Sequence, residues 1–196
     1  QHLASRGRKL LGWDEILEGG LADGASVLSW RGRVGALAAA RAGHDVVACP
    51  EDTVYLDYRE SDLESEPIPT CTVTTVEKAY SFDPVPAELD SEQARHVLGG
   101  QANLWTEHID SMRGLDYRAF PRLSAVAEAL WTAGDRDYDE FAPRLAEHLA
   151  RLEAAGVEYR HADGPRPWQE RPGVSGRTRS AEEAAAHLAR ITANIG

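Results

Sequence analysis

The sequence predicts an α/β fold built on a parallel sheet, and three observations support this class. Short apolar runs alternate with helix-forming segments, as in strands joined by crossover helices. Four such runs are present, and several end in aromatic and acidic residues. The chain has 196 residues, whereas a complete (β/α)8 barrel needs about 250. We therefore expect either about half of a barrel, completed by another segment, or a different and smaller α/β sheet.

The first part of the chain predicts the order strand, strand, helix, strand. Two short apolar runs, Arg8 to Trp13 and Ala25 to Trp30, are the first two strands, and both end in tryptophan. Strong helix formers follow from Val34 to Ala42, with Gly43 as a C-terminal stop. The third strand is predicted from Asp45 to Cys49.

A long polar connection precedes the fourth strand. Residues 51–86 contain several prolines and one short helical piece around Thr75 to Tyr80. A connection of this length is usually functional in a compact domain. The fourth strand is predicted from His96 to Trp105, where glycines permit close approach of the backbone.

The remainder of the chain is predicted to be mainly helical. Tyr117 to Thr132 and Asp139 to Ala155 have apolar residues at helical spacing, so each predicts one amphipathic helix. We expect a main body over 1–160, a tail rich in proline and glycine over 161–179, and a C-terminal helix over 180–196.

Charge and hydropathy exclude two classes of partner. There are 21 Lys and Arg residues against 32 Asp and Glu, a net charge of −11, which disfavours nucleic acid and anionic lipid. No apolar stretch approaches the ~20 residues that cross a bilayer, so we expect no membrane partner. Lysine occurs only at Lys9 and Lys78, and this arginine and alanine bias suggests a bacterial coding habit. The sequence leaves open whether the protein is secreted or cytoplasmic.

Aromatic and acidic residues gather where the predicted strands end. The carboxyl ends of parallel strands are where α/β barrels place their sites. Aromatic rings pack on the C–H faces of a sugar, and carboxylates accept hydrogen bonds from its hydroxyls. The pattern therefore favours a sugar site. Its residues are Trp13 with Asp14 and Glu15, Trp30 with Arg31, Tyr55 with Asp57, and Trp105 with Glu107.

Other residue types receive structural interpretations. The histidines lack the spacing of metal ligands. Trp131 and Trp168 stand at no strand end and are expected to pack in the interior rather than to bind sugar. Arg122 and Glu128 are expected to form structural ion pairs or caps.

Seven segments together resemble the family 20 glycoside hydrolases, the β-N-acetylhexosaminidases. The resemblance covers roughly residues 8–160, in the order and spacing of the family, and it implies strands five to eight of a (β/α)8 barrel. The segments are GWDEI (Gly12 to Ile16), VLSWRG (Val27 to Gly32), AGHDVVACP (Ala42 to Pro50), YLDY (Tyr55 to Tyr58), EKAYSFDPVP (Glu77 to Pro86), LGGQANLWTEH (Leu98 to His108) and FPRLSAVAEALW (Phe120 to Trp131).

The resemblance implies a pocket for a terminal N-acetylhexosamine. Trp13, Trp30 and Trp105 match the tryptophans that wall this pocket and enclose the acetamido methyl group. Tyr55 matches the tyrosine whose hydroxyl binds the acetamido carbonyl oxygen, a catalytic positioning role.

The resemblance assigns the acidic residues to substrate binding. Asp57 and Glu107 match residues that bind the 4- and 6-hydroxyls of the sugar. Asp14 and Glu15 are neighbours in an extended segment, so they point to opposite faces. We expect Asp14 to line or support the pocket and do not expect Glu15 to be the general acid.

The implied reaction is substrate-assisted retaining hydrolysis of an N-acetylhexosamine-terminated oligosaccharide, without metal or organic cofactor. The family carries its catalytic Asp-Glu pair at the end of strand four in an HxGGDE-like motif, and this sequence contains no such motif. We therefore expect the N-terminal half of the same polypeptide as partner and no hydrolysis by this chain alone. The alternative is a non-catalytic sugar-binding or scaffold fragment of such a barrel.

Overall fold

The computed structural model describes residues 2–68, 71–174 and 177–195, and the chain forms two compact units. Unit 1 consists of 1–51, 83–101 and 181–196, and unit 2 of 52–82 and 102–180. Within the described ranges, no helix is long and apolar enough to cross a bilayer. The division at 160 and 179 stays a prediction.

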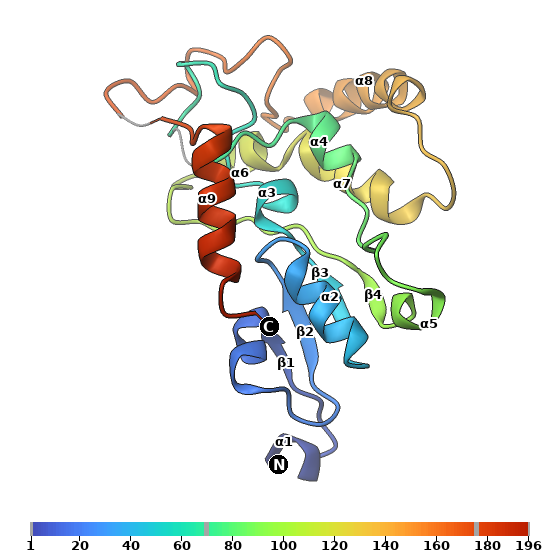
Figure 1. Ribbon diagram of the computed structural model, residues 1–196. Coiled ribbons are helices and arrows are strands. Elements are labelled where there is room, and N and C mark those ends of the chain that lie inside the picture. Colours follow the sequence, from blue (N-terminus) through green and yellow to red (C-terminus); the bar gives the residue numbers. More distant parts are fainter. Residues whose placement is uncertain (1, 69–70, 175–176, 196) are drawn as a thin grey trace. The chain divides into compact units, whose positions relative to one another are not determined.

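Unit 1 contains the predicted parallel sheet. Its four strands lie in chain order and are all parallel (Figure 1). They are β1 (Leu11–Trp13), β2 (Ser26–Ser29), β3 (Val46–Ala48) and β4 (Val97–Gly100). Each lies within a predicted apolar run, so the strand and helix alternation is confirmed, although every strand is shorter than its run.

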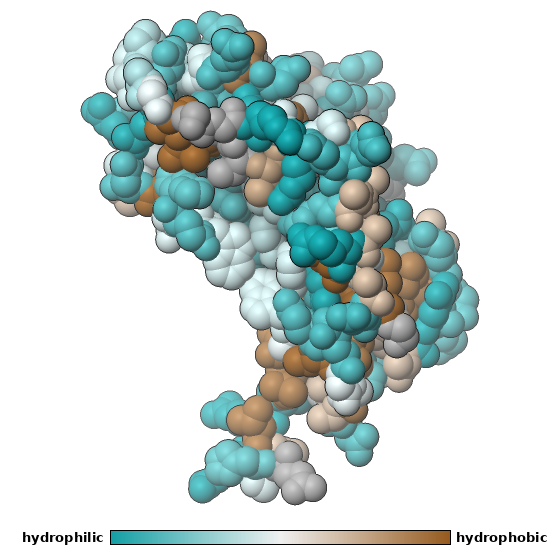
Figure 2. Space-filling view, turned by 60° about the vertical axis from the view of Figure 1, so that its left-hand side comes forward, coloured by the Kyte–Doolittle hydropathy of each residue, from teal (hydrophilic) through white to brown (hydrophobic). Residues whose placement is uncertain are grey.

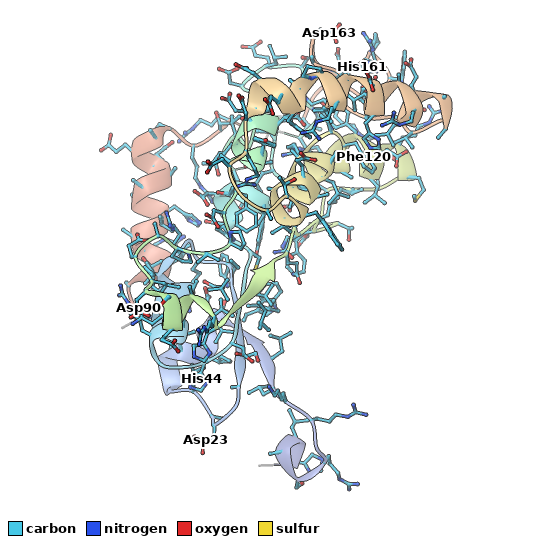
Figure 3. All side chains as sticks on the ribbon, turned by 90° about the vertical axis from the view of Figure 1, so that its right-hand side faces the viewer. Asp23, His44, Asp90, Phe120, His161 and Asp163 are labelled. Atoms are coloured by element: carbon cyan, nitrogen blue, oxygen red, sulfur yellow. The ribbon has the colours of Figure 1, made fainter. Side chains whose placement is uncertain are left out.

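One face of this sheet is covered by α2 (Val34–Arg41), the predicted helix (Figure 1). Three buried alanines of α2 form the core with Val27 and Val46, which are fully buried on neighbouring strands. Small alanine side chains let the helix approach the sheet closely, while the β-branched valines fill the remaining space. The short helix α5 (Ser91–Ala94) also contacts α2, and Asp90 caps it (Figure 3).

The outer strands β1 and β4 are edges of the sheet, because each pairs with one neighbour. Leu11 of β1 and Leu98 of β4 have exposed fractions of 53% and 63%. Figure 2 shows hydrophobic side chains on the surface around the N-terminal end, where α1 (His2–Ser5) and Leu10 are also exposed. An edge strand with exposed apolar side chains is a surface on which a further strand can pair.

The fourth strand is shorter than the predicted run from His96 to Trp105. Regular pairing ends at Gly100, and the register shifts between Val46 and Val47. Gly99 has a φ of 140°, which a residue with a Cβ adopts rarely, so the pleat is interrupted there.

Unit 2 is helical. Helix α4 packs on α7, and the rings of Tyr80 and Phe141 stack with centroids 4.6 Å apart. The helices of unit 2 are α4 (Val76–Tyr80), α6 (Met112–Ala119), α7 (Arg122–Trp131) and α8 (Tyr138–Ala154), with α3 (Glu51–Val54) at the boundary between the units. Both α4 and α8 agree with their predicted positions.

The predicted single helix from Tyr117 to Thr132 is wrong, because the structure has two helices there. The chain leaves the helical conformation at Phe120, whose φ and ψ of −110° and 140° are extended (Figure 3). Proline at position 121 disfavours helical geometry in the residue before it, and it starts α7 as the cap.

The two tryptophans expected to pack in the interior are exposed. Trp131 is 89% exposed and Trp168 is 64% exposed, so this prediction is wrong. The buried positions of α7 are 122, 125, 126 and 129, and position 131 falls on another face of the helix. The tail from 161 carries Trp168 and contains no helix or strand among its described residues up to 180.

Buried ion pairs hold unit 2 together. Arg122 is 1% exposed, and its Nε lies 3.1 Å from Oε2 of Glu60. Its guanidinium also donates to the carbonyl oxygens of Leu56 and Tyr58 at 2.6 and 2.9 Å. On the surface, Arg144 pairs with Glu128 at 2.6 Å, so the structural roles expected for Arg122 and Glu128 are confirmed.

Candidate functional site

Unit 1 carries the first group of predicted site residues, where two parallel strands end side by side. Trp13 is the last residue of β1, and Trp30 directly follows β2. Trp13 pairs in register with Leu28, two residues before Trp30, so both tryptophans lie at the carboxyl-terminal end of the sheet. Each tryptophan is half-buried, which leaves part of the ring accessible.

Asp14 lies at the centre of this group and is fully buried. Its Oδ2 accepts hydrogen bonds from the backbone N–H groups of Trp30 and Arg31 at 3.0 and 3.1 Å. Its Oδ1 accepts from Nε of Arg31 at 2.7 Å. Burial raises the pKa of Asp14, although the Arg31 bonds oppose that shift. The carboxylate thus fixes the turn that carries Trp30, and direct contact of Asp14 with a sugar stays a prediction.

Glu15 has a different task from its neighbour. Its carboxylate oxygens accept from the indole Nε1 of Trp30 at 3.1 and 3.2 Å. Asp14 therefore binds the backbone N–H of Trp30, and Glu15 binds its indole N–H. Both lie in the 3-10 helix η1 (Asp14–Gly19), because the chain turns immediately after β1.

Arg31 links this turn to the C-terminal helix α9 (Ala181–Thr192). Its Nη1 donates to Oε1 of Glu18 at 2.6 Å and to the carbonyl oxygen of Ile191 at 3.0 Å. A Cβ on Gly32 would come within 2.9 Å of Leu188 Cδ1, so helix and turn are in close contact. The sequence named Arg31 only as a neighbour of Trp30, and no pattern indicated Glu18. The apolar spacing of the last helix predicts docking by Leu188, Ile191 and Ile195, and the structure brings Leu188 and Ile191 to this turn.

A second link between α9 and the same region involves Glu51. Nε2 of His187 lies 2.7 Å from Oε1 of Glu51, with both side chains largely buried. The backbone N–H of Glu51 donates to the carbonyl oxygen of Trp30 at 2.9 Å. Helix α9 therefore supports the Trp30 turn from two directions.

Unit 2 carries the second group, in which Tyr55 and Trp105 are neighbours. Their ring centroids are 6.3 Å apart with planes inclined by 53°. Tyr55 forms a parallel bridge with Asn103, and the N–H of Leu56 donates to the Asn103 carbonyl at 2.7 Å. This short pairing brings together two segments that are separated by about fifty positions in the sequence.

The second group also contains a carboxylate. The N–H of Trp105 donates to Oδ1 of Asp57 at 3.5 Å, and burial raises the pKa of Asp57. Tyr55 is 7% exposed and Trp105 is 41% exposed, so the indole forms the accessible surface beside the phenol. Glu107 is exposed in the loop that follows Trp105.

Each group combines an aromatic face with acidic acceptors. This is the chemistry that binds a sugar ring and its hydroxyls. In the part of the chain that the structure describes, no group of three or more His, Cys, Asp or Glu side chains could hold a metal ion.

Comparison with known proteins identifies the family. The model of the glycosyl hydrolase family 20 catalytic domain matches residues 1–134. A β-hexosaminidase of Porphyromonas gingivalis is 43% identical over 175 residues, which are 88% of this chain and 22% of that protein. A β-N-acetylhexosaminidase of Cellulomonas fimi is 31% identical over 166 residues, 83% of this chain and 33% of that protein.

Solved structures agree with this result. The exo-β-N-acetylglucosaminidase of Vibrio harveyi in complex with N-acetylglucosamine superposes with a TM-score of 0.69 at 35% identity, over 81% of this chain and 25% of that one. A β-hexosaminidase variant of Streptomyces plicatus in complex with its product gives 0.71 at 33% identity, over 83% and 34%. The chain spans about a third or less of these relatives, and it belongs to glycosyl hydrolase family 20 as part of a catalytic domain.

Proposed function

We propose that this chain is the C-terminal half, strands five to eight, of the catalytic barrel of an exo-acting β-N-acetylhexosaminidase. The complete protein would release terminal N-acetylglucosamine or N-acetylgalactosamine from the non-reducing ends of oligosaccharides. The observation that carries the proposal is the second group, in which Trp105 lies against Tyr55 while its N–H reaches the carboxylate of Asp57.

The form of the sheet supports the barrel assignment. Four parallel strands in chain order are what one half of an eight-stranded barrel would contribute, and a closed barrel has no edge strands. The exposed leucines on β1 and β4 mark the two edges at which further strands would add. Under this proposal, the N-terminal half of the same polypeptide would be the partner that adds these strands.

In the proposed reaction, the acetamido oxygen of the substrate attacks its own anomeric carbon while the bond to the leaving oxygen breaks. The resulting oxazolinium-type intermediate is then opened by water, with net retention of configuration. A well-oriented intramolecular attack lowers the barrier by roughly 7 to 11 kcal/mol. In this chain Tyr55 would orient the acetamido carbonyl, and the three tryptophans Trp13, Trp30 and Trp105 would restrict the ring.

Proton transfer to the leaving oxygen requires a carboxylic acid outside this sequence. Asp14 is occupied by backbone and guanidinium donors, and Glu15 holds the Trp30 indole, so neither is placed as that acid. The chain's own acidic residues Asp57 and Glu107 would bind the sugar hydroxyls.

A non-catalytic sugar-binding or scaffold fragment is the second candidate function. The accessible aromatic ring and the acidic acceptors of the second group would serve sugar binding alone as well. One observation distinguishes the two candidate functions, namely whether a longer polypeptide hydrolyses the substrate. A polypeptide that contains this chain together with an HxGGDE-like motif would hydrolyse an N-acetyl-β-hexosaminide, whereas the fragment would bind sugar without turnover.

The test uses that longer polypeptide and a chromogenic N-acetyl-β-glucosaminide. We expect Tyr55→Phe to lower kcat by about 10²-fold, because a reacting group that is no longer held in the productive orientation costs about this much. Trp105→Ala should raise KM and lower kcat, since it removes a wall of the pocket.

Trp131→Ala is the matched control, because Trp131 is 89% exposed and belongs to neither group. Thermal unfolding should remain within a few degrees of the wild type for Tyr55→Phe, since the ring stays in place. Wild-type kinetics in both Tyr55→Phe and Trp105→Ala would refute the assignment of the second group.

A further inference from the structure

Unit 2 contains a cavity that is separate from both groups described above. Its volume is about 190 Å³, and it lies between the start of α6, the segment at Pro67 and Ile68, and the loop at Trp168. Three arginines and a histidine line it, namely Arg113, Arg118, Arg171 and His108, and no carboxylate is among its lining residues. A concentration of positive charge is unusual on a chain whose net charge is −11.

Arg118 is the buried residue at the floor of this cavity. It is 4% exposed, and its guanidinium donates to the carbonyl oxygens of Tyr58, Pro67 and Ile68. Among the residues that the structure describes, no carboxylate forms an ion pair with it. Burial, together with nearby Arg122, lowers the pKa of Arg118 to about 10. The charges of Glu66 and Asp57 act on Arg118 from nearby. The hydrogen bonds of its guanidinium go to carbonyl oxygens, so a bound anion in the cavity would add a direct ionic partner.

Arg113 and Arg171 form the rim of the cavity. Their side chains are 70% and 42% exposed, and they pair with Glu158 and Asp110 respectively. Exposed ion pairs of this kind contribute little to stability. Either guanidinium can exchange its surface carboxylate for an anion in the cavity at small cost.

The start of α6 adds further donors. Ser111 caps this helix of eight residues, and its first turn contains no acidic side chain. Ser111 and Gly114 both line the cavity, so the positive end of the helix dipole is directed to the same place. This end of the helix reinforces the cationic lining but would not form a site without it.

Trp168 offers an apolar surface beside these charges. Its indole Nε1 donates to Oε2 of Glu158 at 2.9 Å, which fixes the ring although it is 64% exposed. A flat, fixed and accessible indole is suited to the face of a sugar ring. Packing in the interior does not explain Trp168, because its side chain is exposed, whereas contact with a ligand would explain it.

We propose that this cavity binds a small oxyanion, such as a sulfate, phosphate or carboxylate group. The anion would contact Arg118 and draw Arg113 and Arg171 inward, and a sugar that carries the group would lie on Trp168. The proposal uses none of the residues assigned to the hexosamine site, so it stands or fails independently of the proposed hydrolase function.

The test is a titration of the 196-residue chain with sodium sulfate against sodium chloride at constant ionic strength. Tryptophan fluorescence is the readout, and Trp168→Phe identifies the responding ring. We expect a saturable response in the wild type and about tenfold weaker binding in Arg113→Gln or Arg171→Gln, because each loses a charge-assisted hydrogen bond.

Arg144→Gln is the matched control, since Arg144 also forms a surface ion pair, with Glu128 at 2.6 Å, but lies outside the cavity. Circular dichroism verifies that all variants are folded. Unchanged sulfate affinity in both rim variants, an equal loss in Arg144→Gln, or no saturable response in the wild type would each overturn the proposal.

A second titration identifies the source of the anion. Glucose 6-sulfate, glucose and inorganic sulfate are compared at equal ionic strength. Tighter binding of glucose 6-sulfate than of sulfate, lost in Trp168→Ala, assigns the cavity to an anionic sugar. Equal binding of the two, with none by glucose, assigns it to a free anion. Binding of glucose as tight as that of its sulfate would contradict an anion site.

Discussion

At the scale of single residues, the carboxylates of this chain differ in function according to which donors reach them. Asp14 and Glu15 are adjacent and chemically similar, yet one is fully buried on backbone N–H groups and the other holds an indole. The alternation of side chains along an extended segment predicted that the two would separate, but both lie in the 3-10 helix η1, so the premise of that prediction is wrong. The alternation could not predict which donors each would meet, because these come from the turn after the next strand.

Glu66 shows the same dependence on distant donors within unit 2. Its Oε1 accepts from Ser61 Oγ at 2.7 Å and from Arg160 Nε at 2.8 Å, and its Oε2 accepts from the Tyr117 hydroxyl at 2.8 Å. Burial raises the pKa of Glu66, but these bonds and the Arg160 charge outweigh burial and lower it below 4.5. The ionised form is therefore favoured by folding.

This shift gives a prediction for stability against pH. A carboxyl whose pKa is lower in the folded state stabilises the protein above its unfolded pKa, here 4.5, and loses that contribution as the pH falls. We expect Glu66→Gln to cost about 3 kcal/mol at pH 7, because it leaves Arg160 without this partner. It should also reduce the loss of stability below pH 4.5.

Urea unfolding at a series of pH values measures both effects. Glu64→Gln is the matched control, since Glu64 is exposed two positions earlier and should change neither. Glu60 titrates in a different window, because burial raises its pKa to about 7 against the opposing charges of Arg122 and Arg160. If the free energy of unfolding fell with pH below 4.5 as steeply in Glu66→Gln as in the wild type, Glu66 would not be the group that causes this loss of stability.

At the scale of elements, local pattern predicted most of the sheet and the helices that have a clear apolar period. The four strands lie in the apolar runs, and α2 and α8 agree with their predicted ranges within a few residues. The break at Phe120 was not predicted because the apolar spacing continues across Pro121, and a proline near the start of a helix, where its missing N–H costs little, is compatible with one helix. The end of β4 was missed because close strand approach was expected of Gly99, not a positive φ.

Helix α9 is the element whose attachment the sequence described least. Apolar spacing predicts that it docks by Leu188, Ile191 and Ile195. Leu188 does contact Gly32, and Ile195, which follows the end of α9, is buried. The links of α9 to the Trp30 turn through Ile191 and His187 depend on a backbone carbonyl and on a buried partner, Glu51. Neither leaves a periodic signal in sequence.

We predict that Leu188→Ala weakens the attachment of α9. The side chain contacts Gly32, and because Leu188 is 36% exposed, its truncation should cost about 1 kcal/mol, less than a fully buried leucine. Thermal unfolding measures the cost, and hydrogen exchange of the Trp30 and Arg31 amides reports on the turn. Ala185→Ser on the exposed side of α9 is the control. Unchanged exchange at both amides in Leu188→Ala would contradict a supporting role for the helix.

At the scale of the whole molecule, the two compact units each contain one group of site residues. Unit 1 takes its chain from three separate stretches and unit 2 from two, so neither is a continuous segment of sequence. The predicted division along the sequence rests on the family resemblance, which ends near residue 160, and on the segment rich in proline and glycine that follows it. The two units group residues by contacts in space. The sequence predicted that the fourth strand joins the first three, but it did not indicate that residues 181–196 belong to unit 1.

The open sheet of unit 1 leads to a prediction about self-association. An edge strand presents unpaired N–H and C=O groups, and exposed apolar side chains beside them favour pairing with another chain. Leu98 on β4 is 63% exposed, so we expect the isolated chain to associate as its concentration rises. Leu98→Lys should shift the equilibrium several-fold towards monomer, because a charged edge resists docking.

Light scattering over a range of concentrations measures this equilibrium. Met112→Lys is the matched control, since Met112 is 70% exposed but lies on α6 rather than on a strand, so the same charge is added away from the edge. If Met112→Lys reduced association as much as Leu98→Lys, net charge and not the edge would be the cause. If a longer polypeptide that supplies the remaining strands stayed monomeric at concentrations where this chain associates, the open edges would be the surfaces that those strands cover.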